Sequence, residues 1–207
     1  IFLHEKNRGH FEHVLTTAID RYKTVKEREV RKRIEESEKV YSFELPHELF
    51  YNEHLDELVK SKKYAYEPSY LNNDRSKPER AFEAFLNEHA SDIDWWWKNG
   101  ESKQDYFGIK YEYAGTINTF YPDYIVKLVD GRLGLFETKD TADRDGKTYT
   151  KAKAEMLQEY INSQSNKKLF GGIVIERNNT WHINENEVYD WEKCERGDWS
   201  DWNPLIF

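Results

Sequence analysis

The residues best suited to chemistry are two carboxylates and a lysine that lie close together in the sequence. Asp123 precedes one apolar run, and Glu137 and Lys139 end the next. Asp130-Gly131 separates the two runs, and Asp-Gly between apolar segments is a strong signal for a β-hairpin. A hairpin closed there brings the three side chains to the same end of one sheet. Alternation along the strand then places Glu137 and Lys139 on one face and Thr138 on the other.

Two carboxylates at the open end of a hairpin repel each other. At a separation of about 5 Å and an effective dielectric constant near 20, the repulsion costs roughly 3 kcal/mol. A divalent cation removes it. Hard oxygen ligands suit Mg²⁺, which keeps several waters and commonly takes one or two carboxylates plus a phosphate. The pattern therefore predicts a Mg²⁺ site at Asp123 and Glu137, for which Mn²⁺ can substitute.

The same residues resemble the PD-(D/E)XK nuclease motif, with Pro122-Asp123 as its first half and Glu137-Thr138-Lys139 as its second. With their flanking aromatic and aliphatic residues, segments 120–126 and 135–139 are similar to the C-terminal endonuclease domain of type III restriction enzyme res subunits. The resemblance covers approximately residues 76–176. It implies an α-β-β-β-α-β core of the restriction-endonuclease type and Mg²⁺-dependent hydrolysis of phosphodiester bonds in DNA.

The resemblance also implies a role for each residue. Asp123, Glu137 and the backbone carbonyl of Thr138 would hold the metal ion. Lys139 would position or deprotonate the attacking water and stabilise the pentacovalent state. Glu79 matches a glutamate that such nucleases carry on their first helix, and it would reach the metal through a water molecule.

Glu79 has a second reading, in which it does no chemistry. Ser76-Lys-Pro-Glu79 is a capping box, in which the serine and the glutamate each satisfy a backbone N–H at the start of a helix. Both roles of Glu79 stay open. Lys147 and Lys151, at the start of a later helix, are candidates for gripping the DNA backbone, although exposed lysines are more often simply solvated.

Periodicity predicts the elements around the hairpin. An amphipathic helix is expected from about residue 5 to 39 and a short helix at 53–60. A strand at 93–97 is expected to pair with residues 106–113. A helix at about 150–164 and a strand at 169–175 then give a parallel strand pair. The predicted fold is α/β with a mixed α+β sheet. Residues 1–72 are expected to form a helical N-terminal extension with a connector. The resemblance implies that residues 73–207 form an endonuclease-like domain with a Trp-rich tail.

The composition limits the function. The formal net charge is −8, which argues against binding of polyanions by bulk electrostatics, so contact with DNA must use local lysines or a metal ion. Cys194 is the only cysteine, so a reducing compartment fits, and the resemblance implies a prokaryotic cytoplasm. No run of residues has transmembrane length, and no membrane role is expected. Because the chain begins Ile-Phe-Leu, we expect it to be a piece of a longer polypeptide.

The family resemblance implies partners beyond DNA. The parent protein would carry a helicase motor upstream and work beside a methyltransferase or specificity subunit. ATP would act only through that motor, since Gly146-Lys-Thr148 lacks the earlier glycine of a P-loop. The alternative is a non-catalytic nucleic-acid-binding or assembly module that keeps the nuclease fold. In either case Trp95, Trp96 and Trp97 are expected to cover the sheet or to stack on bases.

Overall fold

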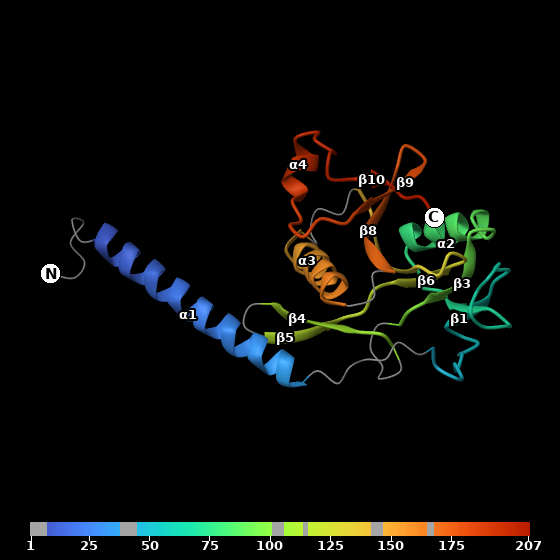
Figure 1. The fold of residues 1–207 in the computed structure, drawn as a ribbon, viewed down its shortest axis with the longest axis horizontal. Coiled ribbons are helices and arrows are strands. Elements are labelled where there is room, and N and C mark those ends of the chain that lie inside the picture. Colours follow the sequence, from blue (N-terminus) through green and yellow to red (C-terminus); the bar gives the residue numbers. More distant parts are fainter. Residues whose placement is uncertain (1–7, 38–44, 101–105, 114–115, 142–146, 165–167) are drawn as a thin grey trace. The chain divides into compact units, whose positions relative to one another are not determined.

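The computed structural model of the chain describes residues 8–37, 45–100, 106–113, 116–141, 147–164 and 168–207 (Figure 1). The chain divides into two compact units. The first comprises residues 1–42 and 110–118, and the second comprises residues 43–109 and 119–207. The predicted division after residue 72 falls within the second unit.

The first unit contains the long helix α1, Arg8–Ser37, in agreement with the helix predicted for this region. The predicted apolar stripe is present on it and exposed to solvent. Phe11, Leu15 and Tyr22 are 45%, 66% and 64% exposed. None of the helices in the described ranges combines the length and the apolar character needed to cross a bilayer.

The second unit is built on a mixed six-stranded sheet with the strand order β10-β9-β8-β7-β6-β3. Neighbouring strands are antiparallel except β7 and β8, which are parallel as predicted. The strands are β3 Ile93–Lys98, β6 Tyr124–Leu128, β7 Leu133–Lys139, β8 Leu169–Arg177, β9 Thr180–Asn184 and β10 Asn203–Pro204. The fold is therefore α/β with a mixed sheet.

The predicted hairpin is present as β6 and β7. Tyr124 pairs with Phe136, and Lys127 pairs with Leu133. At the turn, Gly131 has a φ of 88°, a left-handed conformation that a residue with a side chain adopts only with strain. The Asp130 carboxylate accepts a hydrogen bond from the backbone N–H of Arg132 at 2.9 Å, which closes the turn. This register places residue 123 opposite residue 137 at the open end.

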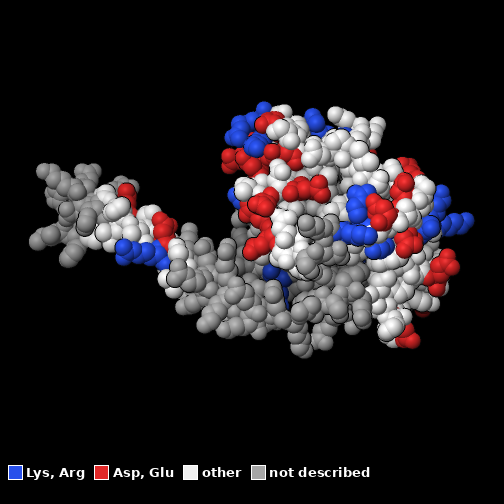
Figure 2. Space-filling view, viewed as in Figure 1, with Lys and Arg blue, Asp and Glu red and all other residues white. Residues whose placement is uncertain are grey.

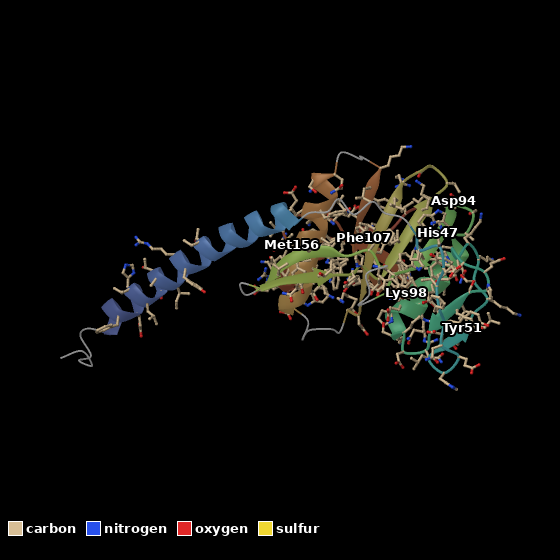
Figure 3. All side chains as sticks on the ribbon, turned by 90° about the horizontal axis from the view of Figure 1, so that it is seen from below. His47, Tyr51, Asp94, Lys98, Phe107 and Met156 are labelled. Carbon is tan, nitrogen blue, oxygen red and sulfur yellow. The ribbon has the colours of Figure 1, made fainter. Side chains whose placement is uncertain are left out.

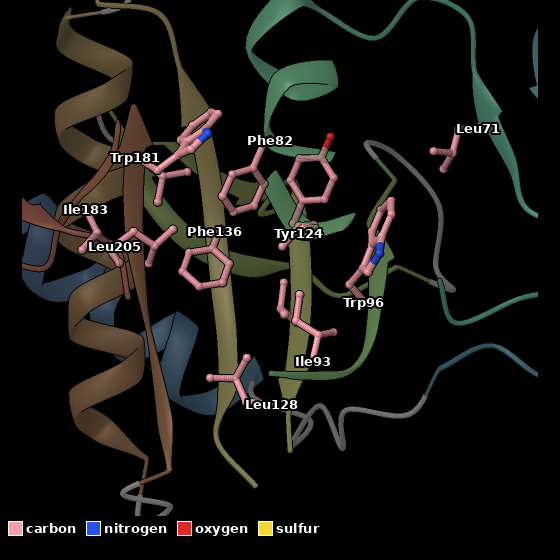
Figure 4. Packing of buried hydrophobic residues seen from close by; sticks show 13 residues of the cluster. Leu71, Phe82, Ile93, Trp96, Tyr124, Leu128, Phe136, Trp181, Ile183 and Leu205 are labelled. Atoms are coloured by element: carbon pink, nitrogen blue, oxygen red, sulfur yellow. The ribbon is translucent and has the colours of Figure 1, made fainter. Parts of the chain in front are cut away.

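Helices cover both faces of the sheet. α2, Lys77–Glu88, packs on one face, where Phe82 contacts the rings of Tyr124, Phe136 and Trp181 (Figure 4). α3, Lys147–Ser163, packs on the other face, where Ala154 joins a cluster with residues of β8 and the C-terminal tryptophans. Because side chains alternate along β7, Phe136 faces α2 and its neighbour Glu137 faces α3.

The prediction that β3 pairs with residues 106–113 is wrong. β3 pairs with β6, whereas β4, Ile109–Tyr113, pairs with β5, Thr116–Phe120. The reason is a buried amide. The Asn99 side chain donates hydrogen bonds to the carbonyls of Phe107 and Pro122 at 2.8 and 2.9 Å. These bonds join the end of β3 to the segment that enters β6. Residues 106–113 are therefore not part of the six-stranded sheet.

The prediction of a short helix at residues 53–60 is also wrong. Residues Asp56–Leu58 form β1, which pairs with β2, Tyr70–Asn72. Just before β1, the backbone N–H of Asn52 donates to the Asp56 carboxylate at 2.7 Å, and that of His54 donates to the Asn52 side chain at 2.9 Å. Such local bonds from side chain to backbone favour a turn over a helix.

The C-terminal part is more regular than the sequence analysis predicted. β8 turns into β9 at Asn178-Asn179, whose φ values of 53° and 58° match the two-residue turn that joins antiparallel strands. Trp181 in β9 enters the α2-facing core. Trp202 and Cys194 join the cluster on the α3 face, Cys194 from the short helix α4, Trp191–Glu195. These tryptophans therefore hold the C-terminal part against the sheet.

The packing of Phe82 predicts a large effect on stability. Its side chain is 0% exposed, so Phe82→Ala removes its ring contacts and leaves a cavity. We expect the free energy of unfolding to fall by about 3–5 kcal/mol, measured by urea denaturation. Phe50 is 92% exposed and serves as the matched control, since Phe50→Ala should change stability by less than about 0.5 kcal/mol. Equal losses in the two variants would contradict the assigned core.

Candidate functional site

The open end of the β6–β7 hairpin brings the predicted residues together. The Asp123 Oδ2 atom accepts hydrogen bonds from the backbone N–H of Thr138 at 2.8 Å and from its hydroxyl at 2.7 Å. Asn99 fixes the backbone beside it, because the Asn99 N–H donates to the Asp123 carbonyl at 2.8 Å. Asp123 is thus held on both its main chain and its side chain, and its second oxygen, Oδ1, has no bond to Thr138.

Glu137 lies at the same end of β7 and is almost completely buried. Its Oε1 atom accepts hydrogen bonds from Lys139 at 2.7 Å and from Lys153 at 3.1 Å. Its Oε2 atom is buried and has no hydrogen-bond partner among the described residues. Burial, followed by the charge of Asp123, raises the pKa of Glu137, and the two lysines partly offset this increase. A buried carboxylate oxygen without a partner is costly and marks a place where a ligand can bind.

A lysine that the sequence analysis did not identify joins the site from β3. The Lys98 Nζ atom lies 2.5 Å from Oε1 of Glu79 and 3.4 Å from Oδ1 of Asp123. It also lies 4.8 Å from the centre of the Tyr124 ring. Lys98 is labelled in Figure 3. Burial lowers the pKa of Lys98, but the nearby carboxylates of Asp123 and Glu79 outweigh burial, and the net shift is upward.

The contacts of Glu79 confirm its capping role, and its predicted role at a metal ion stays a prediction. Its Oε2 atom accepts a hydrogen bond from the Ser76 N–H at 2.6 Å, and the Ser76 hydroxyl accepts one from the Glu79 N–H at 3.4 Å, so the predicted capping box is confirmed. Its Oε1 atom points instead to Lys98. Burial raises the pKa of Glu79, but Lys98 and Ser76 outweigh it, and the net shift is downward. The Lys98 ammonium therefore lies between the carboxylates of Glu79 and Asp123 and links them.

The prediction that lysines at the start of α3 contact DNA stays a prediction. The side chain of Lys147 lies outside the described residues. Lys151 is exposed, and its Nζ lies 3.7 Å from Glu155, one helical turn away. The helix contributes Lys153 to the site instead, where its Nζ also lies 5.0 Å from the centre of the Phe120 ring.

Two sequence signals point to the missed lysines. Lys153 precedes the buried Leu157 by four residues, which places it on the face of α3 that packs against the sheet. Lys98 follows the buried Trp96 by two residues, which places it on the α2-facing side of β3.

The residues at the hairpin end fit a magnesium ion better than a metal held entirely by side chains. Among the described residues, no group of three or more His, Cys, Asp or Glu side chains could hold a metal ion. Mg²⁺ needs fewer protein ligands, because it keeps several waters and uses one or two carboxylates. Oδ1 of Asp123 and Oε2 of Glu137 are oxygens of this kind, and the buried Oε2 has no other partner in the described part of the chain.

Two residues of the tryptophan triplet cover the sheet, and the third is partly exposed. Trp96 and Trp97 are 0% and 1% exposed, so neither ring is available to stack on a base. Trp95 is half-buried and lines a pocket of about 360 Å³ together with Tyr64. Around the visible surface, basic and acidic side chains are interspersed (Figure 2).

Comparisons with protein families, with curated proteins and with solved structures found no match for this chain.

The two hydrogen bonds at Asp123 predict a measurable stability effect. Thr138→Val keeps the shape of the side chain and removes the hydroxyl that donates a hydrogen bond to the Asp123 carboxylate. Because the acceptor is a carboxylate, we expect the free energy of unfolding to fall by about 1.5–3 kcal/mol. Thr180 is exposed on β9, and Thr180→Val provides the control, with a change within about 0.5 kcal/mol. A neutral Thr138→Val variant would contradict the geometry.

The raised pKa of Glu137 predicts a pH dependence with a definite sign. Its pKa in the folded state lies above the ordinary value for a glutamate, so the folded protein holds this proton more tightly than the unfolded chain. The contribution of Glu137 to stability is therefore fully present below the unfolded pKa and is lost as the pH rises through the folded pKa. In chelator-treated buffer, Glu137→Gln should thus gain stability relative to wild type as the pH rises from the ordinary pKa of a glutamate through the raised pKa of Glu137. A constant difference would contradict the shift.

Proposed function

We propose that the chain is the Mg²⁺-dependent endonuclease domain of a type III restriction-like helicase-nuclease and that it hydrolyses phosphodiester bonds in DNA. The observation that carries this proposal is the placement of Asp123, Glu137 and Lys139 at one end of the β6–β7 hairpin, with one oxygen of Glu137 buried and without a hydrogen-bond partner among the described residues. The order α2, β3, β6, β7, α3, β8 supports the proposal, because it agrees with the α-β-β-β-α-β core of restriction endonucleases, with β4 and β5 inserted.

In this proposal, Asp123 and Glu137 hold the metal ion through Oδ1 and Oε2. The backbone carbonyl of Thr138 is the third ligand. In an extended strand the N–H and C=O of one residue point to the same side, and the Thr138 N–H points to Asp123. When bound, the metal ion supplies a water of lowered pKa and stabilises negative charge on the phosphate oxygens.

The lysines orient Glu137 and complete the site. Lys139 and Lys153 both bond Oε1 of Glu137, so the carboxylate is held with Oε2 turned away from them. The side chain of Lys139 is 22% exposed, so its ammonium group can contact both Glu137 and an incoming phosphodiester. There the ammonium positions the attacking water and stabilises charge on the pentacovalent phosphorus. In its neutral amine form, Lys139 would instead accept the proton of that water. Glu79 acts on the metal through water.

The remaining parts of the proposal concern partners. DNA reaches the site despite a net charge of −8, because lysines at the start of α3, Lys147 and Lys151, contact its backbone. The parent protein contributes a helicase motor that uses ATP and works with a methyltransferase or specificity subunit in the prokaryotic cytoplasm. Cleavage in the parent would then depend on ATP even though this chain carries the hydrolytic residues.

A second candidate is a nucleic-acid-binding or assembly module that keeps the nuclease fold without turnover. The observation that favours it is Lys98, whose ammonium already neutralises Glu79 and Asp123 without a metal ion. Turnover and its dependence on Lys139 distinguish the two candidates.

The deciding variant is Lys139→Ala. We expect cleavage of plasmid DNA with Mg²⁺ or Mn²⁺ to fall by at least about a hundredfold, because the variant loses the ammonium group next to the reacting phosphate. The assay uses the isolated chain and the full-length parent with ATP, since the isolated chain alone can be weak. Lys127 contacts the carbonyl of Gly131 at the far end of the hairpin, and Lys127→Ala should cut as wild type does. Undiminished cleavage by Lys139→Ala would end the catalytic assignment.

A further inference from the structure

Lys98 has no role in the proposed nuclease chemistry, although it lies among the described residues of the site. Its side chain is 13% exposed, and its ammonium lies between carboxylates supplied by α2 and by the start of β6. Burying an ammonium group is costly unless it is paired, so the position of Lys98 depends on these two carboxylates.

The two contacts of Lys98 are unequal. Its Nζ lies 2.5 Å from Glu79 but 3.4 Å from Asp123, which is beyond a short charge-assisted hydrogen bond. The Asp123 atom that it approaches is Oδ1, while Oδ2 is bound by both donors of Thr138. Lys98 therefore makes its weaker contact with the oxygen that a metal ion would need.

The ion pairs described at the site are balanced in charge without a metal ion. Among the described residues they join three carboxylates to three ammonium groups, and the formal charges of these six groups sum to zero. The carboxylates are Glu79, Asp123 and Glu137, and the ammonium groups are Lys98, Lys139 and Lys153. A divalent cation that entered this cluster would add two positive charges to it. It would also approach the Lys98 ammonium, which stands at the same oxygen.

We propose that Lys98 is a built-in competitor of the metal ion, which occupies the cation position at Asp123 until a divalent cation displaces it. This inference rests on the proposed metal site at Asp123 and Glu137. On displacement, Lys98 keeps its short contact with Glu79 and gives up its long contact with Asp123. Metal binding by the free protein is consequently weak. It strengthens when a phosphodiester brings negative charge into the balanced cluster.

The test measures binding of Mn²⁺ alone by isothermal titration calorimetry, without nucleic acid. Lys98→Met keeps most of the length of the side chain and removes its charge, so Mn²⁺ should bind about tenfold tighter than to wild type. Lys127→Met removes the same charge from the same sheet, and its Nζ contacts Gly131 at the opposite end of the hairpin. That control should stay within about twofold of wild type.

The outcomes separate this inference from the proposed function. Binding to wild type that is lost in Asp123→Asn, with unchanged or weaker binding to Lys98→Met, would overturn the competitor role and leave the metal site intact. Absence of Mn²⁺ binding in both wild type and Lys98→Met would overturn the metal site and with it this inference. Tighter binding to Lys98→Met, lost again when Asp123→Asn is added, supports both.

A second measurement covers the case in which Lys98→Met does not fold. In wild-type protein labelled with ¹⁵N-lysine, the Nζ signal of Lys98 is followed at low temperature during titration with Mg²⁺. Displacement from Asp123 should shift this signal in step with metal binding, while the signal of Lys127 stays in place. A Lys98 signal that remains fixed at saturating Mg²⁺ would overturn the proposal.

Discussion

The site depends on the pair of hydrogen bonds that Thr138 donates to the carboxylate of Asp123. They tie the residue before β6 to Thr138, which lies beyond the last residue of β7 that pairs with β6. With Oδ2 engaged, only Oδ1 of Asp123 is directed at the rest of the cluster. Asn99 supports the same arrangement from the main chain, because it bonds Pro122 and Asp123 from the end of β3. Three strands therefore fix the position of one carboxylate.

Around this carboxylate, lysines pair with carboxylates on both faces of the sheet. On the α3 face, Lys139 and Lys153 share one oxygen of Glu137. On the α2 face, Lys98 pairs with Glu79 and also lies near Asp123 at the end of the sheet, and Tyr124 donates to Glu83 at 3.0 Å. Buried charges of this kind are tolerated only when they are paired. Although Oε1 of Glu137 is paired with two lysines, its Oε2 atom has no hydrogen-bond partner among the described residues, and burial raises the pKa of this carboxylate.

Aromatic packing makes the cluster rigid. Phe82 packs α2 against Tyr124 and Phe136. This contact fixes the distance of Glu79, which is also on α2, from the sheet. Gly171 and Gly172 allow β8 to approach its neighbours closely, since a Cβ at Gly171 would lie 2.0 Å from the carbonyl oxygen of Leu135. β7 is thereby enclosed between β6 and β8, and its end can carry a buried carboxylate.

The sequence by itself determined the features that local signals specify. These are the hairpin at Asp130-Gly131, the side-chain alternation at Glu137 and Lys139, the capping box at Ser76, and the parallel strand after α3. Each depends on residues within one or two neighbouring elements, where turn chemistry and periodicity are readable. The tertiary structure alone decided which strand lies beside β6 and which ammonium groups enter the site. Lys98 is 25 residues from Asp123, and Lys153 is 16 residues from Glu137. Lysines usually lie on the surface, and only packing against both faces of the sheet brings these two to carboxylates that would otherwise be buried without a counter-charge.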